Sequence, residues 1–163
     1  FDDFDKGHIS ESEFFNELQI ALDAHISADN LLLAWNAMLL DFPKRRLDLL
    51  QKLKPHYRLF LLSNTNETHI AEFEDALFKQ HGFKNLEPFF ETVYYSCRMG
   101  KRKPNADIFM DVLSSNNLNA QETLFIDDSP QHIVGASSTG IQAKLLAKNR
   151  EVEDLLAELG LIK

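Results

Sequence analysis

Hydrophobic positions follow a helical period in the first third of the chain, and the pattern changes near residue 55. Ser10 and Glu13 match a capping box, and the apolar residues that follow them recur on one face of a helix. Pro43 is suited to the first position of a later helix. Helices are expected over residues 10–22, 31–39 and 43–53. Residues 1–50 are therefore predicted to form an all-helical lobe.

From residue 57 onward, short apolar runs alternate with helical patterns. The expected strands are residues 58–62, 92–96, 123–126 and 142–146. The expected helices between and after them are residues 70–78, 108–113, 130–138 and 152–159. This alternation is typical of βα units that build a parallel sheet with helices on both faces. We predict an α/β fold for residues 51–163, with the helical lobe of residues 1–50 appended to it.

Composition narrows the classes of partner. The 163 residues include 25 acidic and 17 basic side chains, for a formal net charge of −8. Neither nucleic acid nor an anionic membrane surface is an expected partner of so acidic a chain. No apolar run approaches the roughly 20 residues of a membrane span. The single cysteine, Cys97, cannot form an internal disulfide, so we expect a cytoplasmic protein.

Two of the expected strands end in groups that can hold an anion. Ligands of parallel sheets bind beyond the carboxyl ends of the strands. Ser63 and Asn64 follow the first strand and precede a helix, where a hydroxyl, backbone N–H groups and the helix dipole converge. The second strand leads into a basic cluster, residues 101–103, before Pro104, which we expect to open the next helix. An ordinary helix cap and a solvated basic loop are the alternative interpretations.

The third strand ends in two adjacent acids, Asp127 and Asp128. Carboxylates that follow a buried strand repel each other and lose solvation unless a cation or hydrogen bonds compensate. Mg²⁺ is a natural partner, because it prefers oxygen ligands and binds through one or two carboxylates together with a phosphate. A simple capping role for Asp128 before Pro130 is the alternative. A hydroxyl, a lysine and an acidic pair at successive strand ends together indicate phosphoryl transfer with a metal.

At these residues the chain resembles the haloacid dehalogenase superfamily, in its subfamily with a helical cap. The family's second motif, a Ser or Thr that ends a strand, is matched by Ser63. Its third, a Lys often found before Pro, is matched by Lys103, and its fourth, an acidic pair, by Asp127 and Asp128. The resemblance implies a Rossmann-like core and a cap within residues 1–50.

The resemblance also implies the chemistry. An aspartate attacks phosphorus, and water then cleaves the aspartyl-phosphate. Ser63 and the amide of Asn64 are expected to hold the phosphoryl group, Lys103 to neutralise it, and Asp128 with Asp127 to bind Mg²⁺. Adjacent acids favour a phosphatase of small phosphorylated metabolites. A haloacid dehalogenase and a catalytically inactive binding module of the same fold are the alternatives, and the cap residues that set specificity remain open.

The family's first motif, which supplies the nucleophile, has no convincing match. Residues 3–7 imitate it, but no apolar strand precedes them and no cap can follow them. We therefore expect the nucleophile in a segment upstream of this chain. Residues 2–13 also resemble a calcium loop, but Phe4 and Lys6 stand at ligand positions and cannot bind Ca²⁺.

Overall fold

The computed structural model describes residues 1–23 and 25–162. The chain divides into two compact units, Phe1–Gly100 and Lys101–Lys163. Each unit contains one pair of parallel strands together with its own helices. The predicted boundary between a cap of residues 1–50 and a core of residues 51–163 stays a prediction.

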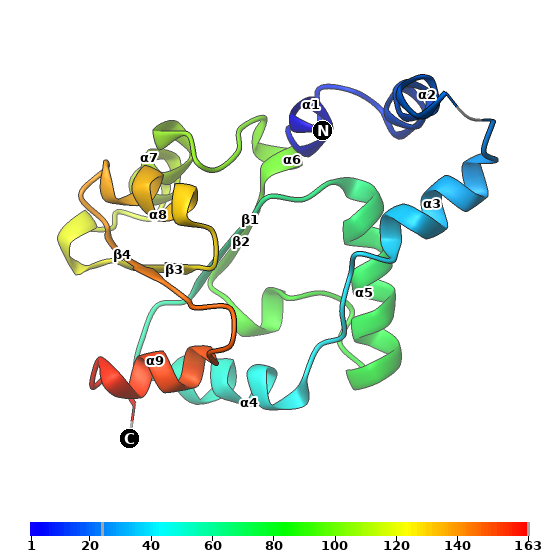
Figure 1. The fold of residues 1–163 in the computed structure, drawn as a ribbon. Coiled ribbons are helices and arrows are strands. Elements are labelled where there is room, and N and C mark those ends of the chain that lie inside the picture. Colours follow the sequence, from blue (N-terminus) through cyan, green and yellow to red (C-terminus); the bar gives the residue numbers. More distant parts are fainter. Residues whose placement is uncertain (24, 163) are drawn as a thin grey trace. The chain divides into compact units, whose positions relative to one another are not determined.

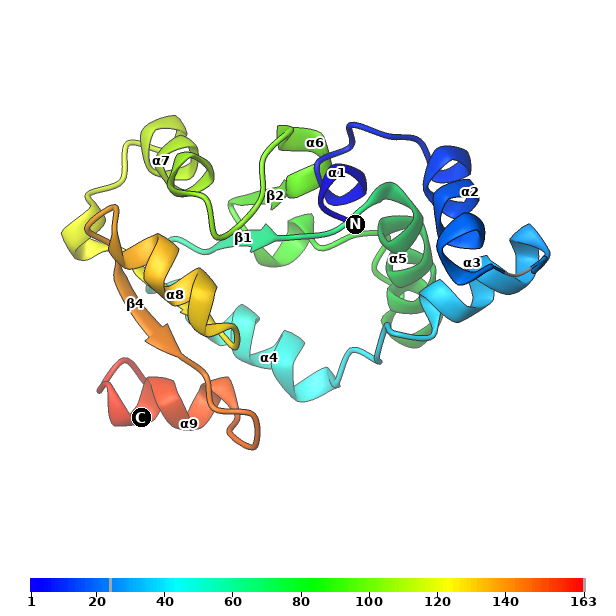
Figure 2. The ribbon, with the colours of Figure 1, turned by 45° about the horizontal axis from the view of Figure 1, so that its top comes forward.

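The first unit begins with three helices, α1 (Asp2–Asp5), α2 (Glu11–Leu22) and α3 (Ala28–Asn36) (Figure 1). The predicted capping box is present: the Ser10 hydroxyl accepts from the Glu13 N–H, and the Glu13 carboxylate accepts from the Ser10 N–H at 2.7 Å. An aromatic and aliphatic core joins the three helices through the buried side chains Phe4, Phe14, Phe15 and Leu31. Helices α2 and α3 lie side by side around this core, and α3 also contacts α5 (Figures 1 and 2).

The rest of the first unit is a βα arrangement. Its elements are α4 (Lys44–Leu53), β1 (Phe60–Ser63), α5 (Glu67–His81), the 3-10 helix η1 (Glu87–Phe89), β2 (Thr92–Tyr95) and α6 (Ser96–Met99). Strands β1 and β2 pair in parallel, with Phe60 opposite Thr92 and Ser63 opposite Tyr95. A second core forms where Leu47, Leu77, Leu86 and Phe89 pack together. The carboxyl ends of β1 and β2 therefore lie next to each other.

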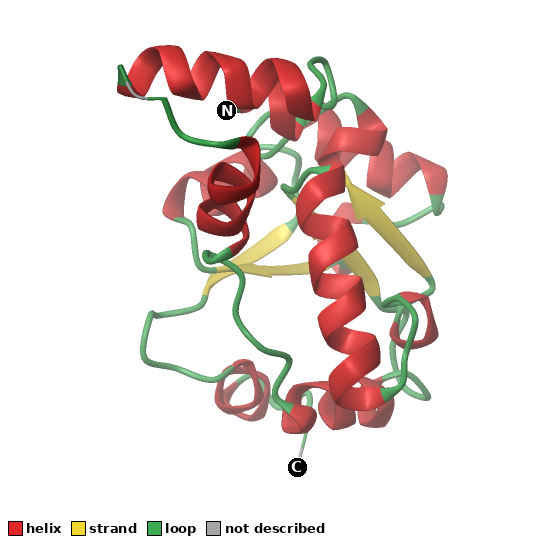
Figure 3. Cartoon of the chain, turned by 90° about the vertical axis from the view of Figure 1, so that its right-hand side faces the viewer, coloured by secondary structure: helices red, strands yellow, loops and turns green. Residues whose placement is uncertain are grey.

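The second unit also alternates helices with one pair of parallel strands. It contains α7 (Ala106–Ser115), the 3-10 helix η2 (Ala120–Glu122), β3 (Leu124–Asp127), α8 (Pro130–Ser137), β4 (Gln142–Leu145) and α9 (Val152–Glu158). Strands β3 and β4 pair in parallel, and α8 packs against both. Gly135 lets α8 approach the loop before α7, because a Cβ atom there would lie only 2.1 Å from the carbonyl oxygen of Pro104. Figure 3 shows by colour how the short strands alternate with helices.

The four predicted strands and their parallel pairing are confirmed, and the protein is a mixed α/β fold of Rossmann-like type. One local expectation differs. Pro104 does not open α7, which begins at Ala106 after Asn105. Pro104 instead follows Lys103 through a cis peptide bond. Among the described residues, no helix is both long and apolar enough to cross a membrane.

Candidate active site

The second unit holds three of the predicted site residues, Lys103, Asp127 and Asp128. Asp127 is the last residue of β3, and Asp128 follows it in the turn that leads into α8. The apolar residues of β3 pair with β4, and this pairing places both acids at the carboxyl end of the strand. The acidic pair is therefore located where parallel α/β sheets bind ligands.

Lys103 lies against Asp127. Its Nζ is 2.7 Å from Oδ2 of Asp127, and the two side chains are only 8% and 9% exposed. The ammonium also lies 5.4 Å from the centre of the Phe125 ring. Burial of two charges is costly unless they are paired and hydrogen-bonded, and this pair meets that condition. The structure thus supports a specific role for Lys103 in the basic cluster.

A residue that the sequence analysis did not select, His132, completes this network. Its Nδ1–H donates to Oδ1 of Asp127 at 2.9 Å, and the Ser129 backbone N–H donates to the same oxygen at 2.9 Å. A carboxylate only accepts hydrogen bonds, so the proton lies on Nδ1 of the imidazole. Position 132 lies in the first turn of α8, within reach of the end of β3. This short separation along the chain was the only sequence feature that could have identified His132 as a site residue.

The network determines the ionisation of Asp127. Burial raises its pKa, but the hydrogen bond and charge of Lys103, with the Ser129 N–H and His132, outweigh burial. The pKa of Asp127 is therefore lowered from its ordinary value. An ionised Asp127 keeps both Lys103 and His132 in fixed positions.

The environment of Asp128 differs from that of the buried, hydrogen-bonded Asp127. Asp128 is exposed, and its carboxylate makes no hydrogen bond or ion pair with any residue in the described part of the chain. The turn before α8 has no side-chain cap, so Asp128 does not act as one. Of the two acids, Asp128 has its oxygens available for a cation, whereas both oxygens of Asp127 already accept hydrogen bonds from protein groups.

The first unit holds the other two predicted residues, Ser63 and Asn64. Ser63 ends β1, and both side chains are half-buried. The predicted helix follows at once as α5, whose N-terminal N–H of His69 is capped by Oδ1 of Asn66 at 3.0 Å. The Thr65 N–H donates to the buried Ser96 hydroxyl at 2.9 Å. These contacts hold the loop after β1 in a defined conformation.

His69 and Cys97 have structural surroundings. The His69 ring stacks on Trp35 with a centroid separation of 4.9 Å, and Nε2 contacts the Trp35 carbonyl oxygen at 3.1 Å. Cys97 is a free thiol, and burial raises its pKa to about 11. A thiol is unreactive when so little of it is ionised. Neither residue has the features of a catalytic group.

Within the described residues, no metal-ion site is formed by protein side chains alone. No three or more His, Cys, Asp or Glu side chains there are placed to hold an ion together. Mg²⁺ does not need such a cluster, because it commonly binds through one or two carboxylates, a phosphate and water. The exposed Asp128 beside the hydrogen-bonded Asp127 fits that mode of binding.

Comparison with known proteins agrees with this geometry. A family model described as haloacid dehalogenase-like hydrolase matches residues 8–145. A D-ribitol-5-phosphate phosphatase of Bacteroides thetaiotaomicron is 28% identical over 133 residues, which are 82% of this chain and 64% of that enzyme. The chain thus spans less than two thirds of this relative. A drimenol cyclase of Aspergillus calidoustus is 26% identical over 161 residues, 96% of this chain and 29% of the cyclase.

A solved structure is similar over nearly the whole chain. It is a haloacid dehalogenase family enzyme of Bacteroides thetaiotaomicron, an aspartate-to-alanine mutant in complex with magnesium and inorganic phosphate. The TM-score is 0.86 at 32% sequence identity, over 94% of this chain and 76% of the other.

Proposed function

This chain belongs to the haloacid dehalogenase-like hydrolase family, and from that premise we propose that the protein is a Mg²⁺-dependent phosphatase of small phosphate monoesters. The observation that supports this most directly is the buried Lys103–Asp127 pair beside the exposed Asp128. A fixed ammonium and a free carboxylate at one strand end suit a phosphoryl group and its metal ion.

Lys103 is proposed to bind the phosphoryl oxygens. Its ammonium donates to Oδ2 of Asp127 at 2.7 Å and is held at the end of β3. Because Asp127 is held ionised by its hydrogen bonds, it keeps the Lys103 side chain oriented before the substrate arrives. A charge that needs no reorientation during the reaction stabilises a transition state more effectively than a mobile one.

Asp128 is proposed as the principal carboxylate ligand of Mg²⁺, with Asp127 beside it. When bound, Mg²⁺ would draw negative charge from the phosphoryl oxygens. Ser63 and the backbone amide of Asn64 are proposed to donate hydrogen bonds to a phosphoryl group. Their position at the end of β1 and ahead of α5 supports this role.

The nucleophilic aspartate that the family resemblance implies has no counterpart among these site residues. We propose that it belongs to a segment outside these 163 residues. Intact-mass and N-terminal sequence measurements on the natural protein test this point. A mass above 18.7 kDa with an aspartate-containing upstream strand supports it, and a mass of 18.7 kDa contradicts it.

Relatives support the substrate class. One is named a D-ribitol-5-phosphate phosphatase, and a solved one holds magnesium and inorganic phosphate. A five-carbon sugar alcohol phosphate is therefore the first substrate to test for this protein.

The test is phosphate release from a panel of sugar and sugar alcohol phosphates, with Mg²⁺ and with a chelator. We expect release that requires Mg²⁺. Halide release from a 2-haloacid without metal would instead indicate a dehalogenase. Binding of inorganic phosphate without turnover of any panel member would indicate a binding module.

A further inference from the structure

Ser96 is fully buried, and its hydroxyl contacts the backbone of two other segments. The Oγ atom accepts from the Thr65 N–H at 2.9 Å. It also lies 2.6 Å from the Asp5 carbonyl oxygen and 3.0 Å from that of Thr65. A hydroxyl has one proton, so it donates to one carbonyl at a time. The shorter distance makes the Asp5 oxygen the principal acceptor, and a lone pair of Oγ then accepts from Thr65.

This hydroxyl extends the attachment of β1 to β2 beyond the ends of the strands. The parallel register stops where Ser63 lies opposite Tyr95. Thr65 and Ser96 lie just beyond these two strand ends. There the Ser96 side chain bonds to the Thr65 backbone, in the place where a sheet would use a backbone group. The loop after β1 is therefore attached by a side chain, and a single substitution can remove the attachment.

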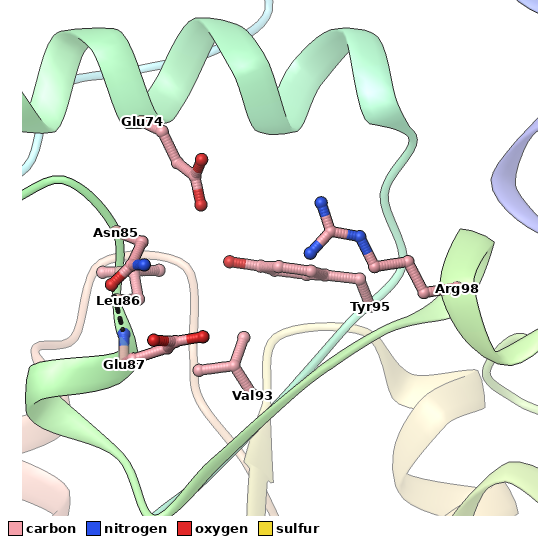
Figure 4. Close-up of a pocket in the computed structure, with 7 residues that line it drawn as sticks. All are labelled: Glu74, Asn85, Leu86, Glu87, Val93, Tyr95 and Arg98. Atoms are coloured by element: carbon pink, nitrogen blue, oxygen red, sulfur yellow. Dashed lines mark hydrogen bonds between the residues drawn. The ribbon is translucent and has the colours of Figure 1, made fainter.

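The neighbours of Ser96 do not provide an equivalent attachment. Tyr95 directs its ring toward the pocket drawn in Figure 4, and Arg98 lies over that ring with Cζ 5.1 Å from its centre. Arg98 also bonds to Glu67, the first residue of α5, at 2.8 and 2.9 Å. Both side chains of this ion pair are more than half exposed, and exposed pairs contribute little. The buried Ser96 hydroxyl is therefore the stronger restraint on the loop.

The restrained segment is the one proposed to hold the phosphoryl group. Thr65 directly follows Ser63 and Asn64 and is itself buried. Asn66 is buried as well, and its Oδ1 accepts from a backbone N–H of α5 at 3.0 Å. Both residues that follow Ser63 and Asn64 are thus fixed, one by Ser96 and the other by the start of α5. Donors that need no reorientation bind an anion more tightly.

We propose that Ser96 is a positioning residue of the phosphoryl-binding loop. Its hydroxyl fixes the Thr65 backbone, and this directs the Ser63 hydroxyl and the Asn64 N–H toward the phosphoryl group. The inference rests on the proposed phosphatase function, which assigns the loop after β1 to that group. Without the hydroxyl, the buried Thr65 N–H loses its acceptor, and the loop has to move to satisfy it.

The first test is binding of inorganic phosphate to the natural protein and to Ser96→Ala, by calorimetry at saturating Mg²⁺. We expect the Kd for phosphate to rise about tenfold in the variant. The Kd for Mg²⁺ without phosphate should stay unchanged, because its proposed ligands, Asp127 and Asp128, belong to the second unit. Ser27→Ala is the matched control: Ser27 caps α3 through the Asn30 N–H at 3.3 Å, and its loss should change neither constant. An equal rise of both constants in Ser96→Ala would overturn the positioning role.

Ser96→Cys separates the hydrogen bond from packing. A thiol fills the space of the hydroxyl but is a weak donor and acceptor, so the Kd for phosphate should rise as it does in Ser96→Ala. The Thr65 amide should also exchange its hydrogen about tenfold faster in both variants. A wild-type Kd or wild-type exchange in both variants would overturn the positioning role alone. A wild-type protein that binds no phosphate would overturn the phosphatase function, and the inference with it.

Discussion

Nζ of Lys103 lies 2.7 Å from Oδ2 of Asp127, and both side chains are more than nine-tenths buried. The two residues are 24 positions apart in the chain. Their pairing connects the loop before α7 to the end of β3. The pairing fixes the position of the Lys103 ammonium next to Asp127, the residue that precedes the exposed Asp128.

Replacement of Lys103 by Ala should lower turnover of a phosphate monoester by about 100-fold or more, because the preorganised charge is lost. It should also lower the free energy of unfolding by about 3–5 kcal/mol, since Asp127 is left buried without its cation. Steady-state kinetics below the melting temperature of the variant separates the two effects. Lys101→Ala is the matched control, because Lys101 pairs with Asp111 in the same region. Equal turnover in the two variants would contradict the role of Lys103.

Asp128→Asn should weaken metal binding without disturbing the buried pair. We expect the Mg²⁺ concentration for half-maximal activity to rise about tenfold, because one anionic oxygen ligand is lost. Asp107→Asn, an exposed position in the first turn of α7, is the control for loss of one charge. A magnesium titration of the three proteins measures the effect. An unchanged magnesium dependence in Asp128→Asn would refute its assignment as a ligand.

His132 acts as a positioning residue through Asp127. His132→Leu should lower turnover about tenfold, since one of the bonds that orient the Asp127 carboxylate is lost. His132→Asn places an N–H donor close to the position of Nδ1 and should restore most of the turnover. If both variants lose the same activity, the hydrogen bond has no role and His132 contributes only to packing.

Stability should depend on pH through Asp127. Because its pKa is lowered from 3.8 in the folded protein, the unfolded chain binds this proton more readily. The contribution of Asp127 is therefore complete above pH 3.8 and is lost as the pH falls through the lower, folded-state pKa. Urea unfolding from about pH 6 to pH 2 measures it. The free energy of unfolding of Asp127→Asn should fall less steeply below about pH 4 than that of the wild-type protein, and parallel curves would contradict the assignment.

Gly135→Ala should destabilise the protein, although Ala usually favours a helix. The new Cβ would lie 2.1 Å from the Pro104 carbonyl oxygen and would displace the backbone beside Lys103. We expect a loss of about 1–3 kcal/mol in the free energy of unfolding. Ser137→Ala, at an exposed position of the same helix, is the control and should change it by less than about 0.5 kcal/mol. Denaturant unfolding of both variants tests the contact, and equal stabilities would disprove it.

Secondary structure was largely predictable because each strand is a short apolar run bounded by polar residues. The strand that ends at Asp127 and the capping box at Ser10 are local patterns, and both were confirmed. The helices α1 and α6 were not predicted. Each has only four residues, which is too few to show a helical period.

Sequence by itself determined the α/β class, the parallel strands and the presence of a lysine and two acids at strand ends, because these follow from local periodicity and the order of motifs. Only the tertiary structure decided that Asp127 binds Lys103 and His132 while Asp128 stays exposed. The physical reason is that burial and hydrogen-bond partners depend on residues far apart in the chain. Two adjacent aspartates are equivalent in the sequence and become different only when folding surrounds one of them.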